Sequence, residues 1–465
     1  MVGPLAEGKD AHLGHSLPQV HDHTGSPETT LLPHLHHTLP YALPLYRRIQ
    51  FGHHSPHTRI LATVPSSPPP PPPTNDGGEQ DRKAQEQEQE QTLHQCFAAT
   101  FIDRSRRPET ESWVYVSWDH PSHHLHHHPS SSSSSSTMTT KPPSSCTCSS
   151  HLLALLSHIA ANTGDDAAAA VPYPPLTAAE ESDIWAAVTA ADARETAARY
   201  HAHTSTSAAR YLDDLHAPAM LKVGSMHARG VAWATGLGFL RRDGVGTGFA
   251  YRKYVFSMTT SQRRGGGDDD DDDENGTAEG EDGGEGEGKR KKKDGDHQRV
   301  MGEGDWEGLR WGRLSEDDLT VTRSRTAIPR TNRTLRTLPS VAVFADAVAS
   351  DGGPEEEGEE EKRGTQKQKP VAWAFLAADG SLSSLHVEPE YRGKGLAKAM
   401  GWKIFQEGWG AFGDDLNGLA HADVALENAE SNGVCKSLGG IDQDWHVYWV
   451  RIDLDRVRAV VTASA

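Results

Sequence analysis

The last third of the chain alternates between two hydrophobic periods, one typical of strands and one typical of helices. Apolar runs predict strands at Leu309–Leu314, Ser340–Ala345, Val371–Leu376, Ser381–Val387, His421–Leu426 and Trp445–Ile452. Leu396, Met400 and Ile404 recur every four residues, as one apolar face of a helix does. Ser315 and the acidic residues after it predict the start of another helix, which ends near Arg325.

The N-terminal half shows the same alternation outside its low-complexity stretches. Strands are predicted at Leu43–Phe51, Thr58–Val64, Phe97–Asp103, Glu111–Trp118, Leu221–His227 and Phe249–Phe256. Helices are predicted at Leu152–Ala161, Ser182–His201 and Ala228–Leu237. Both halves therefore predict an α/β (α+β) fold.

Biased stretches interrupt both halves. They are Pro68–Pro73, Glu79–Gln91, Ser130–Ser136, Gly265–Gly288 and Asp351–Lys369. None can bury enough apolar surface to offset chain entropy, so we interpret them as disordered insertions in loops. The predicted domains are a disordered N-terminus (1–27), an N-terminal lobe (28–256, with insertions 65–92 and 120–150), an acidic linker (257–304) and a C-terminal domain (305–455, with a disordered loop 350–369).

One loop in the C-terminal domain carries candidate chemistry. It consists of Arg392, Gly393, Lys394, Gly395, Leu396 and Ala397, between a predicted strand and a predicted helix. The first N–H groups of a helix have no partner within the helix, and the helix dipole makes this end positive. Both features favour the binding of an anion. The glycines let the backbone approach that anion closely, and Arg392 and Lys394 add positive charge.

This loop resembles the pyrophosphate loop of the GNAT superfamily of acyl-CoA-dependent N-acyltransferases, because Arg392, Gly395 and Ala397 fit Arg/Gln-x-x-Gly-x-Gly/Ala. The order of elements over 305–455 matches that fold, which implies a mixed, mostly antiparallel sheet flanked by helices. Residues 28–256 resemble a second, degenerate GNAT-like lobe without the loop, and this arrangement of two tandem lobes is similar to FR47-like and glycine N-acyltransferase-like proteins. The resemblance implies acetyl-CoA or another acyl-CoA as co-substrate. It also implies that the pyrophosphate lies on Arg392–Ala397 and the pantetheine along Leu385, His386 and Val387.

A second stretch resembles the family motif that follows the cofactor loop. Asn428 matches the family's Asn and Ser431 its small residue, and the resemblance implies that both lie beside the pantetheine. The chain departs from the motif twice. Cys435 stands where the family has a Tyr that protonates the leaving thiolate, and Gly440 stands where it has a Phe. Cys435 could still donate a proton, but a buried thiol that only packs is the alternative.

An amine acceptor must lose a proton before it attacks, which calls for a general base. His386 and Glu388 lie on one face of a predicted strand and are the first candidates, while His421 and Asp423 on the next strand are alternatives. We thus predict an N-acyltransferase that works by direct attack in a ternary complex. A catalytically silent CoA-binding scaffold stays an alternative, as does an interaction protein built on the acidic stretches.

Charge and composition narrow the partners. Lys+Arg 46 against Asp+Glu 65 gives a net charge of −19, which disfavours nucleic acid. No apolar run is long enough to span a membrane, so we expect an intracellular protein, cytoplasmic rather than nuclear despite Lys289–Lys293. A small molecule or amino acid is favoured as amine acceptor over a protein, although an acidic surface would attract basic tails. Acyl length and oligomeric state stay open.

Metal binding is not expected from the sequence. The cysteines Cys96, Cys146, Cys148 and Cys435 are widely scattered, and Cys146-x-Cys148 has no metal-ligand spacing with the others. The His-rich run around His120–His128 is interpreted as a compositional expansion that binds zinc or nickel only weakly.

Overall fold

The structure is a computed structural model. It describes residues 16–66, 95–106, 109–121, 123, 146–162, 177–182, 217, 219–240, 250–257, 306–326, 330–346, 369–413, 416 and 418–464. The predicted linker 258–304, most of loop 350–369, most of the predicted helix Ser182–His201 and the basic run Lys289–Lys293 lie outside these residues. Residues 16–27, expected to be disordered, are folded in part, since His21–Asp22 form strand β1.

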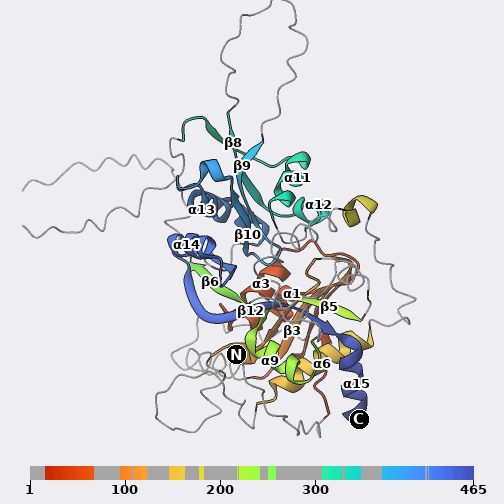
Figure 1. Ribbon diagram of the computed structural model, residues 1–465. Coiled ribbons are helices and arrows are strands. Elements are labelled where there is room, and N and C mark those ends of the chain that lie inside the picture. Colours follow the sequence, from red (N-terminus) through yellow and green to blue (C-terminus); the bar gives the residue numbers. More distant parts are fainter. Residues whose placement is uncertain are drawn as a thin grey trace, which may run out of the picture.

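The described strands form two sheets, and the mixed α/β class predicted from the sequence is confirmed. The four-stranded sheet is antiparallel, in the order β10 (Leu382–Val387), β9 (Pro370–Leu376), β8 (Ser340–Ala345) and β7 (Leu309–Gly312). The eight-stranded sheet has the order β1, β2 (Thr58–Ala62), β3 (Ala98–Asp103), β4 (Ser112–Val116), β5 (Met220–His227), β12 (Ile441–Asp453), β6 (Tyr251–Ser257) and β11 (Leu419–Ala425). Its pairs are antiparallel except for β4 and β5. In Figure 1 the smaller sheet lies above the larger one.

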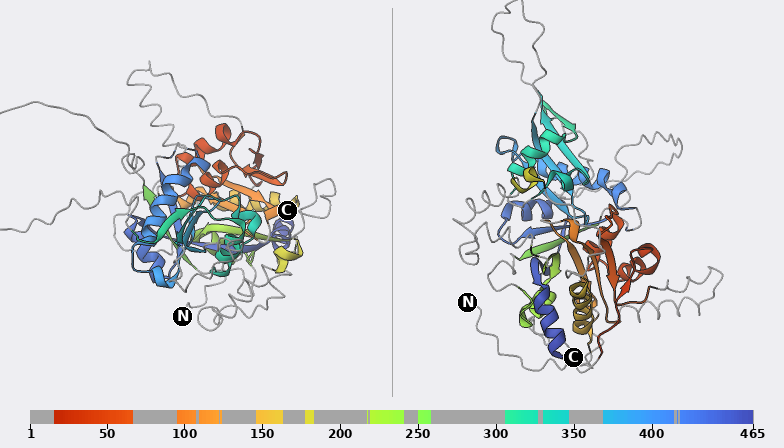
Figure 2. Two further views of the ribbon diagram at one scale, coloured as in Figure 1. Left: turned by 90° about the horizontal axis from the view of Figure 1, so that it is seen from above. Right: turned by 90° about the vertical axis from the view of Figure 1, so that its right-hand side faces the viewer.

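The larger sheet mixes strands from both halves of the chain. β6 lies between β11 and β12 and pairs antiparallel with each, and β12 also pairs with β5. The expectation that Trp445–Ile452 closes the C-terminal sheet is therefore wrong, because its partners come from the N-terminal half. Figure 2 shows these late strands, in blue, running into the N-terminal part of the molecule.

The predicted strand Leu43–Phe51 is instead helix α3 (Leu43–Gln50). Its buried Leu45, Tyr46 and Ile49 follow the helical period, while the alternation of Leu43 and Leu45 suggested a strand. Pro44 also favours the helix, because proline fits the first helical turn and cannot donate within a strand ladder. Helices α1 (Pro27–Thr30) and α2 (Leu32–His36) precede it, and Leu32 and Leu35 of α2 share its buried cluster.

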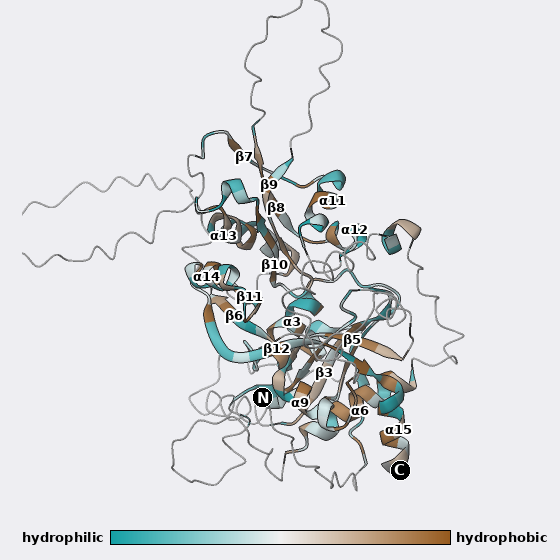
Figure 3. Ribbon diagram, in the orientation of Figure 1, coloured by the Kyte–Doolittle hydropathy of each residue, from teal (hydrophilic) through white to brown (hydrophobic). Residues whose placement is uncertain are grey.

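Helices cover both sheets. α6 (Cys148–Ala161), α9 (Ala228–Gly236) and α15 (Leu454–Ser464) share one buried cluster with β3, β5 and β12. α11 (Glu316–Ser324), α12 (Asn332–Leu335), α13 (Leu396–Gly408) and α14 (Ala429–Ser437) belong to the smaller sheet's side. Figure 3 shows brown and teal residues together on α6 and α15, as expected of amphipathic helices. Among the described residues, no helix has the length and apolar character needed to cross a membrane.

Candidate active site

The predicted anion loop is an open turn that leads into α13. A short 3-10 turn, Pro389–Tyr391, follows the end of β10. After it, Gly393 and Gly395 adopt φ values of +75° and +80°. Gly395 is the N-cap of α13 and no side chain caps that end. The first N–H groups of the helix are thus left without a helical partner or a side-chain cap. Because both φ values are left-handed, glycine is the residue that fits without strain.

Among the described residues, no atom lies close to the Cβ positions of the two glycines, while Trp306 Nε1 donates to the Lys394 carbonyl at 3.1 Å. A Cβ built on Gly393 or on Gly395 would meet nothing within 4 Å. Arg392, Gly393, Lys394 and Gly395 are exposed. Arg392 also donates from Nε to the Val387 carbonyl at 3.0 Å, which ties the loop to the end of β10.

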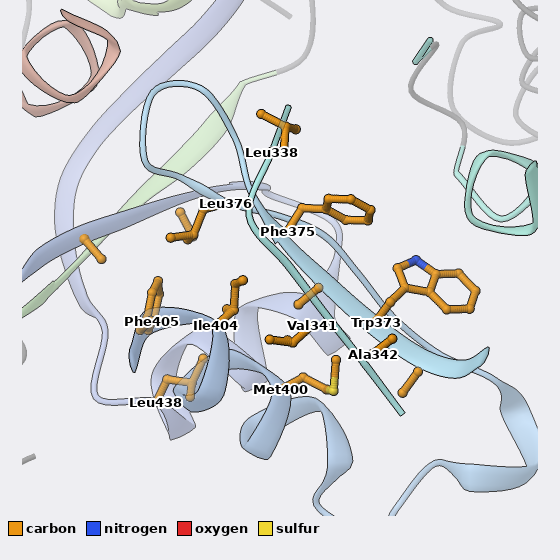
Figure 4. Packing of buried hydrophobic residues seen from close by; sticks show 14 of the residues in the cluster. Leu338, Val341, Ala342, Trp373, Phe375, Leu376, Met400, Ile404, Phe405 and Leu438 are labelled. Carbon is orange, nitrogen blue, oxygen red and sulfur yellow. The ribbon is translucent and has the colours of Figure 1, made fainter. Parts of the chain in front are cut away.

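Core packing fixes the axis of α13. Figure 4 shows Met400, Ile404 and Phe405 on the side of the sheet where Leu376 of β9 and Val341 of β8 lie, while Trp373 and Phe375 point away from α13. At Gly401 a Cβ would lie 2.6 Å from Leu438 Cδ1, so α14 can pack closely on α13 only because this residue is glycine. Helix α13, which begins at the loop, is therefore fixed by the sheet on one side and by Leu438 at the end of α14 on another.

The outer edge of β10 is largely without a strand partner among the described residues. β10 meets β11 only through one isolated parallel bridge, Ser381 to His421. Its register with β9 shifts between Ser383 and His386, and Ser384 has a φ of +51°. Such a bulge turns backbone groups away from the ladder. The strand beside the loop thus offers N–H and C=O groups for an extended ligand.

His386 and Glu388 lie close together beside this edge. The His386 ring stacks on Trp373 at a centroid distance of 4.6 Å, and its Nε2 lies 3.5 Å from Glu388 Oε2. Burial lowers the pKa of His386 from 6.5, and the hydrogen bond and charge of Glu388 oppose that shift. Burial alone would raise the pKa of Glu388, but hydrogen bonds from Arg325, at 2.8 Å, and His386 lower it. His386 is therefore neutral near pH 7 and can accept a proton.

Asn428 and Ser431 make a local contact at the start of α14. The Asn428 side chain accepts from the Ser431 backbone N–H at 3.0 Å and so caps the helix. Asn432, one residue further, donates to the carbonyls of Asn428 and Ala425 and accepts from the Tyr254 hydroxyl at 2.9 Å. Tyr254 belongs to β6, so the N-terminal half supports this second motif directly.

The two departures from the family motif have a structural explanation. Cys435 is buried in the core, and burial raises its pKa to about 12. At Gly440 a Cβ would lie 2.6 Å from the ring of Phe256 and 2.8 Å from the Cys435 carbonyl oxygen. Phe256 comes from β6 and packs on Phe405 of α13 at 5.0 Å between ring centroids. An aromatic side chain from the N-terminal half thus fills the space next to residue 440.

Comparison with known proteins decides the family. The family described as the N-terminal domain of the acyl-CoA N-acyltransferase verG matches residues 17–254, which is more than half of the chain. The chain belongs to this family. The expected recognition as an acyl-CoA N-acyltransferase is confirmed at the level of this family, whose match covers the N-terminal half of the chain. The open turn at Gly395 and the outer edge of β10 lie outside the matched residues.

Solved structures add little to this family assignment. A Drosophila protein matches with a TM-score of 0.42 and 10% identity, over 93% of this chain and 98% of its own. A protein from Novosphingobium aromaticivorans described as a GNAT-family acetyltransferase matches with a TM-score of 0.22 and 16% identity, over 31% of this chain and 56% of its own. Scores this low carry no argument. A comparison with curated protein sequences gives no match.

A buried polar network, missed at the sequence level, joins the two sheets. Lys253 of β6 lies 2.6 Å from Asp423 Oδ1, donates to Ser225 Oγ at 3.0 Å, and lies 3.2 Å from His421 Nδ1. His421 Nε2 donates to the Asp379 carbonyl at 2.8 Å, and Trp113 donates to the Asp379 carboxylate at 3.0 Å. Burial and Lys253 lower the pKa of His421. A lone lysine inside the apolar run Tyr251–Phe256 was the signal that could have indicated this network.

Access separates the alternative bases. The side chains of His421 and Asp423 are 0% and 3% exposed, against 19% for His386 and 17% for Glu388. The cavity that touches Ser225 and Lys253 measures about 20 Å³, enough for a water molecule. A larger pocket of about 560 Å³ lies at α1–α3, beside Leu32, Tyr46 and Phe412, and no predicted site residue lines it. His386 is therefore the better placed of the candidate bases.

Proposed function

We propose that the protein transfers an acyl group from acyl-CoA to an amine by direct attack in a ternary complex. The observation that carries this proposal is the uncapped start of α13. There, two left-handed glycines open a helix end that no side chain caps. Within the described part of the chain, the outer edge of β10 beside it is bridged only at Ser381, just before the strand. An anion of the size of a pyrophosphate finds at such an end both hydrogen-bond donors and positive potential.

The rest of the co-substrate would follow β10. The pantetheine amides would pair with the outer edge of the strand at Leu385, His386 and Val387, as an added strand does. The bulge at Ser384 would direct a backbone N–H toward the thioester carbonyl, where negative charge develops during attack. We assign Asn428 and Ser431 to the neighbouring wall, where their mutual hydrogen bond fixes the start of α14.

His386 would take the proton of the attacking amine. Its lowered pKa keeps it neutral, Trp373 fixes the plane of its ring, and Glu388 stabilises the imidazolium that forms. Arg325 in turn holds Glu388 ionised and in place. The leaving thiolate would be protonated by water, because Cys435, the candidate acid from the sequence, is buried in the core. We favour a small amine or an amino acid as acceptor.

Calorimetric titration with acetyl-CoA tests the co-substrate site. We expect micromolar binding to the wild type and no measurable binding to Gly395→Glu, because the carboxylate would occupy and repel the anion position. Gly52→Glu is the matched control, since Gly52 also has a left-handed φ, of +65°, and no atom near its Cβ position. This control carries the same charge and backbone strain and should bind normally.

Two outcomes would count against the proposal. If acetyl-CoA bound Gly395→Glu as tightly as the wild type, the loop would not be part of the co-substrate site. Binding without turnover over a panel of amines and acyl lengths would favour the silent CoA-binding scaffold instead.

A further inference from the structure

Three of the four cysteines meet a histidine in the N-terminal half. The ligand atoms of Cys96, His123, Cys146 and Cys148 all lie within 4.8 Å of one another. His123 Nε2 is 3.5 Å from the Cys96 sulfur and 3.4 Å from the Cys148 sulfur. The sulfurs of Cys96 and Cys146 are 3.9 Å apart. Residues far apart in sequence therefore form one compact cluster of soft ligands.

These separations match the edges of a tetrahedral metal site. With Zn–S near 2.3 Å and Zn–N near 2.0–2.1 Å, tetrahedral angles put sulfur and nitrogen about 3.6 Å apart and two sulfurs about 3.8 Å apart. A disulfide would need sulfurs at about 2.05 Å. The observed 3.9 Å between Cys96 and Cys146 is too long for that bond, and all three cysteines are free.

Position also favours a cation here. Cys148 is the first residue of α6, where the helix dipole stabilises a thiolate. The Ser117 hydroxyl lies 3.3 Å from the Cys148 sulfur and can hydrogen-bond it as an outer partner.

We propose that Cys96, His123, Cys146 and Cys148 bind a structural Zn²⁺ ion. Four protein ligands complete a tetrahedron and leave no position for substrate, which is the arrangement of structural rather than catalytic zinc. The expectation that these cysteines lack metal-ligand spacing is wrong, because it counted sequence distance and the fold closes that distance. The site is independent of the acyl-CoA site.

The ligands tie three elements together. Cys96 precedes β3, His123 follows the 3-10 turn Ser117–Asp119 at the end of β4, and Cys146 and Cys148 open α6. His123 and Cys148 are fully buried, and α6 packs on β3 in the core around Leu152. A metal at this point would join the elements that carry His123 and Cys146, and its binding free energy would add to folding because the unfolded chain has no preformed site.

Metal analysis of the full-length protein tests the site. After purification and dialysis, we expect about one zinc per wild-type chain. Cys148→Ser should lose it, His123→Cys should keep it because a Cys₄ set also binds zinc, and Cys435→Ser, the matched cysteine outside the cluster, should be unchanged. Cobalt substitution should give thiolate-to-metal charge-transfer bands in the wild type. The His-rich run would bind cobalt without these bands, so the spectrum separates the two sources.

The wild-type measurement stands even if a variant fails to fold. A wild-type chain without stoichiometric metal would overturn the proposal, and so would a disulfide among the three cysteines detected by mass spectrometry without reduction. Cobalt spectra that lack thiolate charge transfer would do the same.

Discussion

The loop at Gly395 and the network around Lys253 both contain polar groups, yet they are built in opposite ways. At the loop, which follows the end of β10 at Val387, the exposed start of α13 lacks a side-chain cap. In the network, a buried lysine contacts an aspartate, a serine and a histidine. Accessible polar groups without a hydrogen-bond partner can bind a ligand, whereas buried polar groups that are paired within the protein stabilise the fold.

The largest effect is expected from a substitution in the buried network around Lys253. Lys253→Met leaves Asp423 charged and buried without its main partner, which should lower the free energy of unfolding by about 3–5 kcal/mol. Denaturant unfolding measures this. The double variant Lys253→Met/Asp423→Leu should recover most of the loss, because a buried pair replaced by apolar groups costs little.

An exposed ion pair provides the control for that measurement. Lys403→Met removes the partially exposed contact with Glu407 and should change the free energy of unfolding by at most about 0.5 kcal/mol. If Lys253→Met were as mild as this control while acyl transfer stopped, the network would belong to the reaction and the contrast with the loop would fail.

The next largest effect is expected at His386, in the accessible region beside the loop at Gly395. His386→Ala should lower kcat/KM by about 10²–10⁴-fold, the usual contribution of a positioned general base, with acyl-CoA binding retained. His158→Ala, an exposed histidine of α6, should leave turnover unchanged. Steady-state kinetics over a pH series measure both. Unchanged turnover in His386→Ala at every pH would exclude this residue as the base and direct attention to His421 and Asp423.

Much of the accessible region beside the loop could be predicted from the sequence, and little of the buried network could. The loop Arg392–Ala397 and the helix after it are local, because glycine positions and a four-residue apolar period act over a few residues. The pairing of Lys253 with Asp423 depends on β6 being inserted between β11 and β12. Strand order of this kind is set by packing between distant segments, which no local pattern encodes.

The same distinction explains the other errors and successes. Leu43–Phe51 was misassigned because two periods overlap in a short apolar run, and only the packing of Tyr46 and Ile49 selects the helix. Gly440 was noted as a departure without an explanation, since Phe256, which fills the adjacent space, lies in the other half of the chain. The cysteines were considered scattered for the same reason.

A smaller effect sharpens the role of Glu388. Glu388 raises the pKa of His386, so Glu388→Gln should lower that pKa further. Activity requires neutral His386 and falls as pH drops through its pKa. The acid limb of the kcat/KM profile should therefore move to lower pH, while the plateau rate falls by less than about tenfold. A limb that moves to higher pH would contradict the assignment.

The smallest effect is expected at Cys435. Because burial raises its pKa to about 12 and core residues surround it, we expect the thiol to pack rather than to donate a proton. Cys435→Ala should leave kcat within about threefold and lower the free energy of unfolding by about 1 kcal/mol. Cys435→Ser should cost more, about 1–3 kcal/mol, because it buries a hydroxyl in an apolar site. If both variants instead lost turnover with stability intact, Cys435 would be the acid for the leaving thiolate. Helix α14 would then belong to the reactive site together with the loop at Gly395.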